Sequence, residues 1–136
     1  MCGFAGFLDF THRGNNNDIL YAMIATIRHR GPDDSGIFFQ HNEHCSIGLG
    51  HARLSIIDLS SKGHQPMSYK HLSIVYNGEI YNYREIKKEL KEIGHTFIST
   101  SDTEVILHAY EQWGRECVSH FIGMLHSRYL TPKVKS

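Results

Sequence analysis

Cys2 is the first residue whose type and position suggest chemistry, because it stands directly behind Met1 in the opening stretch MCGFAGF. Removal of Met1 would give Cys2 a free α-amino group close to its own thiol. An α-amino group titrates near neutral pH, so it can accept the proton of a neighbouring thiol. Nucleophile and base would then come from one residue. On its own, however, a cysteine here is more often a small buried side chain.

Four further stretches carry residue types that suit a small-molecule site. Arg53 follows an apolar run, and Asn77-Gly78 ends another. An Asn-Gly pair after a strand is usually a hairpin turn. Asp102 stands at the start of a helical pattern, where a carboxylate is more often a cap than a ligand. The four stretches are RHRGPDDSG (28–36), GHARLSIID (50–58), VYNGEIYNY (75–83) and STSDTEVIL (99–107).

Composition limits the class of protein. The 136 residues are enough for one domain, and 14 basic and 14 acidic side chains cancel. A neutral chain carries no electrostatic signature for nucleic acid or an anionic membrane surface. No apolar run reaches membrane-spanning length, and no signal-peptide pattern opens the chain. Three widely separated cysteines argue against a disulfide framework, so we expect a cytoplasmic protein.

The 11 histidines raise the alternative of a metal-binding protein. They are scattered, and neither an HExxH nor a CxxC spacing occurs. His41, His44 and Cys45 form the nearest approach to a metal cluster, although a turn-and-strand surface explains them equally well. We therefore expect no metal site.

The spacing of apolar residues and the positions of helix-breaking residues predict the helices and strands that must position these side chains. A buried strand is predicted for residues 3–9, and Asp18 can cap a helix that runs to about Arg28. Ser101 and Glu104 have the form of a capping box and open a helix that runs to about Trp113. Short strands before the last helices indicate an α+β domain with mainly antiparallel strands. Further strands are predicted in 36–40, 45–54 and 72–77, a helix in 79–94 with an apolar stripe of Ile86, Leu90 and Ile93, and a short helix from Gly114 to Phe121.

In this order, the stretches resemble the class II, or N-terminal nucleophile, glutamine amidotransferase domain. Within that family the chain is most similar to the glutaminase domain of glutamine-hydrolysing asparagine synthetases. The resemblance implies an N-terminal-nucleophile hydrolase fold, a mainly antiparallel two-sheet sandwich flanked by helices (αββα). It covers residues 1 to about 124 and is carried by MCGFAG, RHRGPDDSG, HARLSIIDLS, GHQPM, YNGEIYNYREI and SDTEVILHAYEQWG.

The resemblance also implies a role for each matching residue. Cys2 would attack the side-chain amide of glutamine and form a thioester that water hydrolyses. The Asn77 amide and the Gly78 N–H would hold the oxyanion. Arg53 would bind the substrate α-carboxylate, and Asp102 with Glu79 the α-ammonium. Backbone groups of Leu54, Ser55, Ile56 and Ile57 would line the site, whereas His29, Arg30, Asp33, His51 and His64 are interpreted as structural.

The chain departs from the family pattern after Gly123-Met124. The family typically continues there with an apolar Phe-Ala-Phe-Ala strand, whereas this chain reads LHSRYLTPKVKS. We therefore expect the strand to be lost and the sandwich to be incomplete. On this interpretation, residues 1–136 are the N-terminal part of a type-2 glutamine amidotransferase domain, cut short at its C-terminal end, and the synthetase domain for ATP and aspartate is absent.

Two hypotheses of function follow, and the sequence leaves both open. The first is an enzyme that hydrolyses L-glutamine and supplies ammonia for ATP-dependent asparagine synthesis from aspartate, although the acceptor could be another carboxylate or a sugar. The second is a catalytically inactive fragment or a partner-binding remnant. No cofactor is expected in this chain, since ATP and Mg²⁺ belong to the synthetase domain. The expected protein partners are a second copy in a homodimer or a separate synthetase domain.

Overall fold

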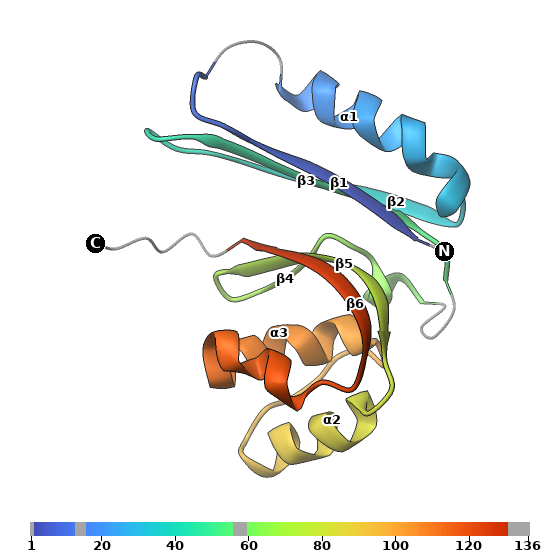
Figure 1. The fold of residues 1–136 in the computed structure, drawn as a ribbon, viewed down its shortest axis with the longest axis vertical. Coiled ribbons are helices and arrows are strands. Elements are labelled where there is room, and N and C mark those ends of the chain that lie inside the picture. The colour runs from blue at the N-terminus through green and yellow to red at the C-terminus, as the bar shows by residue number, and fades with distance from the viewer. Residues whose placement is uncertain (1, 13–15, 56–59, 131–136) are drawn as a thin grey trace.

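The computed structural model describes residues 2–12, 16–55 and 60–130. Two three-stranded antiparallel sheets lie face to face, with helices on both outer sides (Figure 1). This is the predicted α+β, αββα arrangement. No helix in the described part of the chain is both long and apolar enough to cross a lipid bilayer.

The first sheet has the order β1-β3-β2 and carries the N-terminal end of the chain at one end. Its central strand has two glycines that let the covering helix approach closely. A Cβ atom added at Gly50 would lie 2.4 Å from the side chain of Ile24. Leu20 and Ile24 are buried in this contact. The elements are β1 (Gly3–Asp9), β2 (Asp34–His41), β3 (Ser46–Arg53) and the covering helix α1 (Asn16–Ile27).

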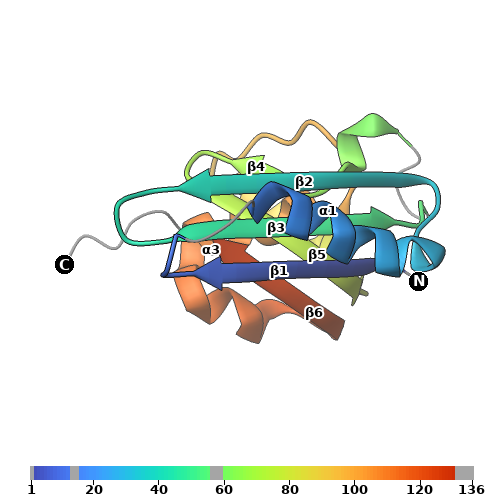
Figure 2. The same ribbon diagram turned by 90° about the horizontal axis from the view of Figure 1, so that it is seen from above.

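The second sheet has the order β4-β5-β6, and two helices cover its outer face. Alternate residues of β5 point toward these helices and form the main apolar core with them. Viewed from above, β5 and β6 run obliquely beneath the strands of the first sheet (Figure 2). The elements are β4 (Met67–Tyr69), β5 (Leu72–Ile80), β6 (Gly123–Leu130), α2 (Tyr83–Glu92) and α3 (Asp102–Trp113), followed by a 3₁₀ helix (Gly114–His120).

The start of α3 follows the predicted cap in part. The Ser101 hydroxyl accepts a hydrogen bond from the Thr103 N–H at 3.1 Å. The Glu104 carboxylate does not complete a capping box, because it accepts hydrogen bonds from the Ile98 and Ser99 N–H groups, both at 2.8 Å. The cap therefore ties the helix start to the segment before it, and the helix ends before Gly114, as predicted.

The strand predicted to be lost after Met124 is present, so this expectation is wrong. β6 pairs with β5 without interruption, from Gly123 opposite Ile80 to Leu130 opposite Ser73. Ladder hydrogen bonds come from the backbone, so a polar strand can form them. The inward-facing Leu125 also packs against the core of the second sheet.

Three other boundaries differ from the predictions. Glu79 continues β5 instead of opening a helix, and α2 begins at Tyr83. Ile93 follows the end of α2 and is exposed, so it does not join the buried stripe. Asp18 lies in the first turn of α1 rather than at its cap. The short strand β4 was not predicted, because three residues are too few for a periodic signal.

Candidate active site

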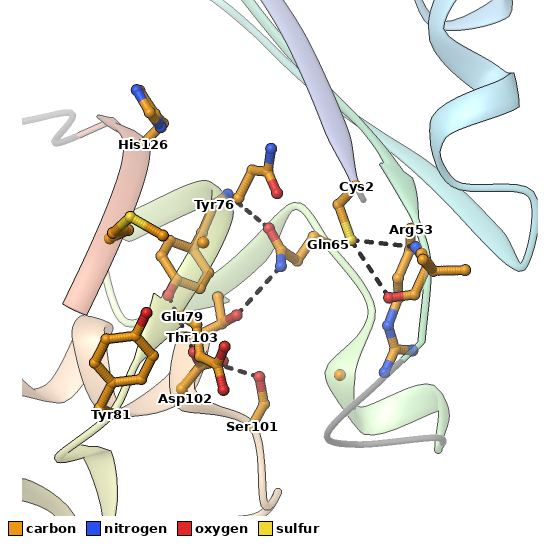
Figure 3. A pocket seen from close by; sticks show the side chains of 15 residues that line it. Cys2, Arg53, Gln65, Tyr76, Glu79, Tyr81, Ser101, Asp102, Thr103 and His126 are labelled. Atoms are coloured by element: carbon orange, nitrogen blue, oxygen red, sulfur yellow. Dashed lines mark hydrogen bonds between the residues drawn. The ribbon is translucent and has the colours of Figure 1, made fainter.

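A cavity of about 390 Å³ opens where the N-terminal end of β1, the end of β3, strand β5 and the start of α3 meet (Figure 3). Both sheets and one helix contribute side chains to it. The lining residues are Cys2, Arg53, Leu54, Gly63, Gln65, Tyr76, Asn77, Gly78, Glu79, Tyr81, Ser101, Asp102, Thr103, Met124 and His126.

Cys2 is fixed at the cavity wall by the end of β3. Its Sγ atom accepts a hydrogen bond from the Leu54 N–H at 3.2 Å and donates to the Leu54 carbonyl oxygen at 3.4 Å. Its own carbonyl oxygen accepts from Arg30 Nε at 3.3 Å. The half-buried thiol is therefore held by the backbone of Leu54, the Cys2 backbone by Arg30, and Cys2 still lines the cavity.

Asn77 and Gly78 lie within β5 and are not the hairpin turn that their sequence usually forms. They pair with His126 and Leu125 of β6. Gly78 has a φ of 154°, and a Cβ atom there would lie 2.2 Å from the Met124 carbonyl oxygen. Only glycine allows the two strands to approach so closely at this point.

Arg53 closes one side of the cavity. Its side chain is buried, and Nη1 donates a hydrogen bond to the Ser60 carbonyl oxygen at 2.9 Å. Its backbone carbonyl oxygen accepts from the Asp33 N–H at 3.0 Å. The guanidinium is thus held in one place, which suits planar recognition of a carboxylate.

Asp102 and Glu79 supply the acidic part of the cavity. Asp102 is the first residue of α3 and is buried, and its Oδ2 accepts from the Tyr76 hydroxyl at 3.1 Å and the Ile80 N–H at 3.4 Å. Burial raises the pKa of the Asp102 carboxyl, and these hydrogen bonds act against the shift. Glu79 is exposed. The arginine and the carboxylates together match the two charges of an amino acid.

The structure brings most of the predicted site residues to this one cavity. Cys2, Arg53, Leu54, Asn77, Gly78, Glu79 and Asp102 all line it. Ser55 is not part of the lining, and its N–H donates to Asp33 Oδ2 at 2.9 Å. Ile56 and Ile57 lie outside the described residues.

Sequence reasoning missed several lining residues. Tyr76 has the alternation of a core residue and is indeed buried, so only its hydroxyl hinted at a polar role. Met124 and His126 lie on the strand that was expected to be lost. Gln65 belongs to the GHQPM stretch, in which no residue type by itself indicates a site. The remaining missed residues are Gly63, Tyr81, Ser101 and Thr103.

His51 lies on β3, two residues before Arg53, and is completely buried. Its Nε2 donates a hydrogen bond to the Tyr76 carbonyl oxygen at 3.0 Å, which joins the two sheets. Burial is the main cause that lowers the pKa of His51 to about 4. The imidazole is therefore neutral at physiological pH. His64, also interpreted as structural, pairs with Asp34.

Acidification from pH 6.5 toward pH 4 is expected to lower the free energy of unfolding. In this interval His51 binds a proton in the unfolded chain but not in the folded one. The free energy of unfolding therefore falls by at most about 3 kcal/mol. His108, whose pKa burial also lowers, acts in the same direction. Asp102 opposes it, because its raised pKa makes the folded state hold a proton more firmly.

Denaturant unfolding at a series of pH values tests this expectation. The His51→Gln variant should show a smaller loss of stability between pH 6.5 and pH 4 than the unsubstituted chain. An equal loss in both chains would contradict the assignment of this titration to His51.

Among the described residues, no group of three or more histidine, cysteine or acidic side chains is arranged to hold a metal ion. At the suggested cluster, His41 Nδ1 lies 2.8 Å from the Ser46 hydroxyl. The N–H groups of His44 and Cys45 donate to Asn42 Oδ1 at 2.8 and 3.0 Å. These contacts describe a turn between β2 and β3.

Comparison with known proteins agrees with the resemblance. A family profile described as a glutamine amidotransferase domain matches residues 1–127. The chain therefore belongs to the glutamine amidotransferase domain family. It is 44% identical, over 140 residues, to a putative glutamine-hydrolysing asparagine synthetase 2 of Methanocaldococcus jannaschii, and 41% identical over 129 residues to asparagine synthetase 3 of Bacillus subtilis. Each match covers 91% of this chain but only 26% and 20% of those relatives.

A solved structure agrees with the fold. Glutamine phosphoribosylpyrophosphate amidotransferase from Bacillus subtilis superposes with a TM-score of 0.75 at 19% identity. The superposition covers 96% of this chain and 35% of that one. The predicted fold of the N-terminal-nucleophile amidotransferases is thereby confirmed.

Proposed function

We propose that this chain hydrolyses L-glutamine to glutamate and ammonia with Cys2 as the nucleophile. One observation carries the proposal: a single cavity gathers a thiol, an Asn-Gly pair, a buried arginine and two carboxylates. A thiol flanked by groups of both charges fits an amino acid with a reactive side chain better than it fits a sugar or a nucleotide.

In the proposed first half-reaction, Met1 has been removed and the α-amine of Cys2 takes the thiol proton. The thiolate forms a C–S bond with the amide carbon of glutamine. The oxyanion accepts hydrogen bonds from the Asn77 side-chain amide and the Gly78 N–H. The α-ammonium returns the proton to the amide nitrogen and the C–N bond breaks. Ammonia departs, and the acyl group remains on Cys2 as a thioester. In related oxyanion holes, loss of one donor costs roughly 3–4 kcal/mol.

In the second half-reaction, the α-amine accepts a proton from water and the resulting hydroxide attacks the thioester carbon. The same two donors hold the second oxyanion. The C–S bond breaks, the thiol regains a proton from the ammonium, and glutamate is released. Arg53 would bind the α-carboxylate of the substrate, and Asp102 and Glu79 its α-ammonium, so that the amide carbon faces the thiol.

The proposal also includes the reaction that consumes the ammonia. Similarity to glutamine-hydrolysing asparagine synthetases supports ATP-dependent amidation of aspartate as the consuming reaction. ATP and Mg²⁺ would then be bound by a synthetase domain, and we assign no cofactor to the residues of this chain. That domain, or a second copy of the chain, is the proposed protein partner. Among the described residues, Cys2, Cys45 and Cys117 form no disulfide, which suits the reducing cytoplasm that we propose as the location.

Incubation of the purified 136-residue chain with L-glutamine tests the hydrolysis. Glutamate and ammonia should appear in equal amounts, and L-asparagine, which is one methylene shorter, should be a much poorer substrate. Turnover no faster than in a Cys2→Ala variant would favour the inactive-fragment alternative. The structural reason for that alternative, loss of the strand after Met124, does not hold, since β6 is formed.

A further inference from the structure

Tyr76 occupies a point of β5 where the neighbouring strand has ended. β4 pairs Met67 with Ile74, and its register, if continued, would place Gln65 opposite Tyr76. In a strand the N–H and C=O groups of one residue point to the same side. Both backbone groups of Tyr76 therefore face the place that β4 has left, and a buried backbone group there needs another partner.

Side chains from two other segments supply the missing partners. The Tyr76 N–H donates to Gln65 Oε1 at 2.7 Å, and the Tyr76 carbonyl oxygen accepts from His51 Nε2 at 3.0 Å. Gln65 is held in turn by a hydrogen bond from its Nε2 to the Thr103 hydroxyl at 3.2 Å. His51 and Gln65 are both buried. Figure 3 shows Gln65 between Tyr76 and Thr103.

Stability alone does not explain the choice of histidine at position 51. Its Nδ1 is a buried atom that has no hydrogen-bond partner among the described residues. An unsatisfied buried acceptor costs about 1–3 kcal/mol. The neutral imidazole with its proton on Nε2 is the form that the Tyr76 carbonyl oxygen requires, and burial, which lowers the pKa of His51 to about 4, maintains it.

These contacts act on the oxyanion donors, because the Tyr76 carbonyl belongs to the peptide group that leads into Asn77. His51 also lies on β3, where its neighbour Ala52 is opposite Gly3, the residue after Cys2. One hydrogen bond therefore connects the strand beside the nucleophile with the strand that carries the oxyanion donors.

We infer that His51 and Gln65 are positioning residues of the glutaminase reaction, which hold the peptide group before Asn77 so that the Asn77 amide and the Gly78 N–H face the oxyanion. The inference rests on the proposed function and deepens it. Neither side chain needs to touch the reacting atoms.

The test compares two reactions of Cys2. Glutamine hydrolysis needs the oxyanion donors, whereas alkylation of Cys2 by iodoacetamide displaces iodide and forms no oxyanion. In His51→Leu and in Gln65→Met we expect kcat for glutamine to fall about 100-fold, with KM and the alkylation rate within about threefold of the unsubstituted chain. His51→Gln, whose Nε2 can donate to the Tyr76 carbonyl oxygen, should recover most of the lost kcat.

His108→Leu is the matched control, because His108 is an equally buried histidine that does not line the cavity. This variant should leave the ratio of the glutamine hydrolysis rate to the Cys2 alkylation rate unchanged. Near-ultraviolet circular dichroism shows which variants fold. If His51→Leu does not fold, the rates of Gln65→Met test the inference.

Two failures are distinguishable. In the first, the unsubstituted chain hydrolyses glutamine, but the variants lose alkylation and hydrolysis equally, keep full kcat, or all fail to fold. Any of these results would show that the two residues are structural only and would overturn the inference. If the unsubstituted chain shows no Cys2-dependent hydrolysis, the proposed function itself fails, and the inference fails with it.

Discussion

Replacement of Cys2 by alanine is expected to reduce glutamine hydrolysis by at least about 10⁴-fold, because the covalent step has no other nucleophile. Cys2 supplies both the attacking sulfur and the α-amine that moves the proton. Alanine keeps the amine and removes only the thiol. Binding of glutamine through Arg53 and Asp102 should survive, so calorimetry should give similar affinities for the variant and the unsubstituted chain.

Cys45→Ala serves as the matched control for this substitution. Cys45 is a buried cysteine, whereas Cys2 is half-buried, and it lies in the turn before β3 and does not line the cavity. Its replacement should leave the rate within about twofold, since its side chain does not line the cavity and its loss acts on the stability of the first sheet. Residual hydrolysis by Cys2→Ala close to the rate of the Cys45→Ala chain would contradict a thioester mechanism at Cys2.

Replacement of Gly78 by alanine is expected to lower kcat by about 100-fold and to destabilise the fold by about 1–3 kcal/mol. The added methyl group would lie 2.2 Å from the Met124 carbonyl oxygen, and the φ of 154° is unfavourable for any side chain. The backbone of β5 must shift to relieve the contact, and the Gly78 N–H shifts with it. Steady-state kinetics and thermal unfolding measure the two effects.

Gly94→Ala separates backbone strain from displacement of the site. Gly94 also has a positive φ, of 103°, but a Cβ atom there would have no neighbour within 4 Å. It follows α2 and is not part of the cavity lining. This variant should lose some stability and keep its kcat. Equal kcat losses in Gly78→Ala and Gly94→Ala would show that the effect is general strain and would remove Gly78 from the site.

Local features of the fold were largely predictable from the sequence. The cap of α3 at Ser101 and the end of the helix before Gly114 follow from residues within a few positions of each boundary. The same holds for the strand over residues 3–9. Short-range capping and alternation do not depend on distant partners, so one segment suffices to infer them.

Features that depend on distant partners were not predictable. The charged neighbourhood of Glu79 predicts a helix, yet pairing with Met124 of β6 keeps this residue in a strand. β6 itself lacks the apolar alternation and exists through its backbone pairing with β5. The roles of His51 and Gln65 depend on where β4 ends relative to Tyr76, which no local pattern records.

For the candidate site, the resemblance located the lining residues better than periodicity did. Asn77-Gly78 shows the difference: by its residue types the pair predicts a turn, whereas by comparison with the family it predicts oxyanion donors. The structure places the pair within a strand, at the cavity that Cys2 also lines.

The nucleophilic role of Cys2 is tested by the intact mass of the chain after incubation with a glutamine analogue that carries an alkylating group in place of its amide. If Cys2 is the nucleophile, one adduct forms, located on Cys2, in a chain from which Met1 is absent. Excess L-glutamine should protect against it. A chain that lacks Met1, retains an unmodified Cys2 and forms no adduct would show that Cys2 is not the nucleophile of a glutamine site.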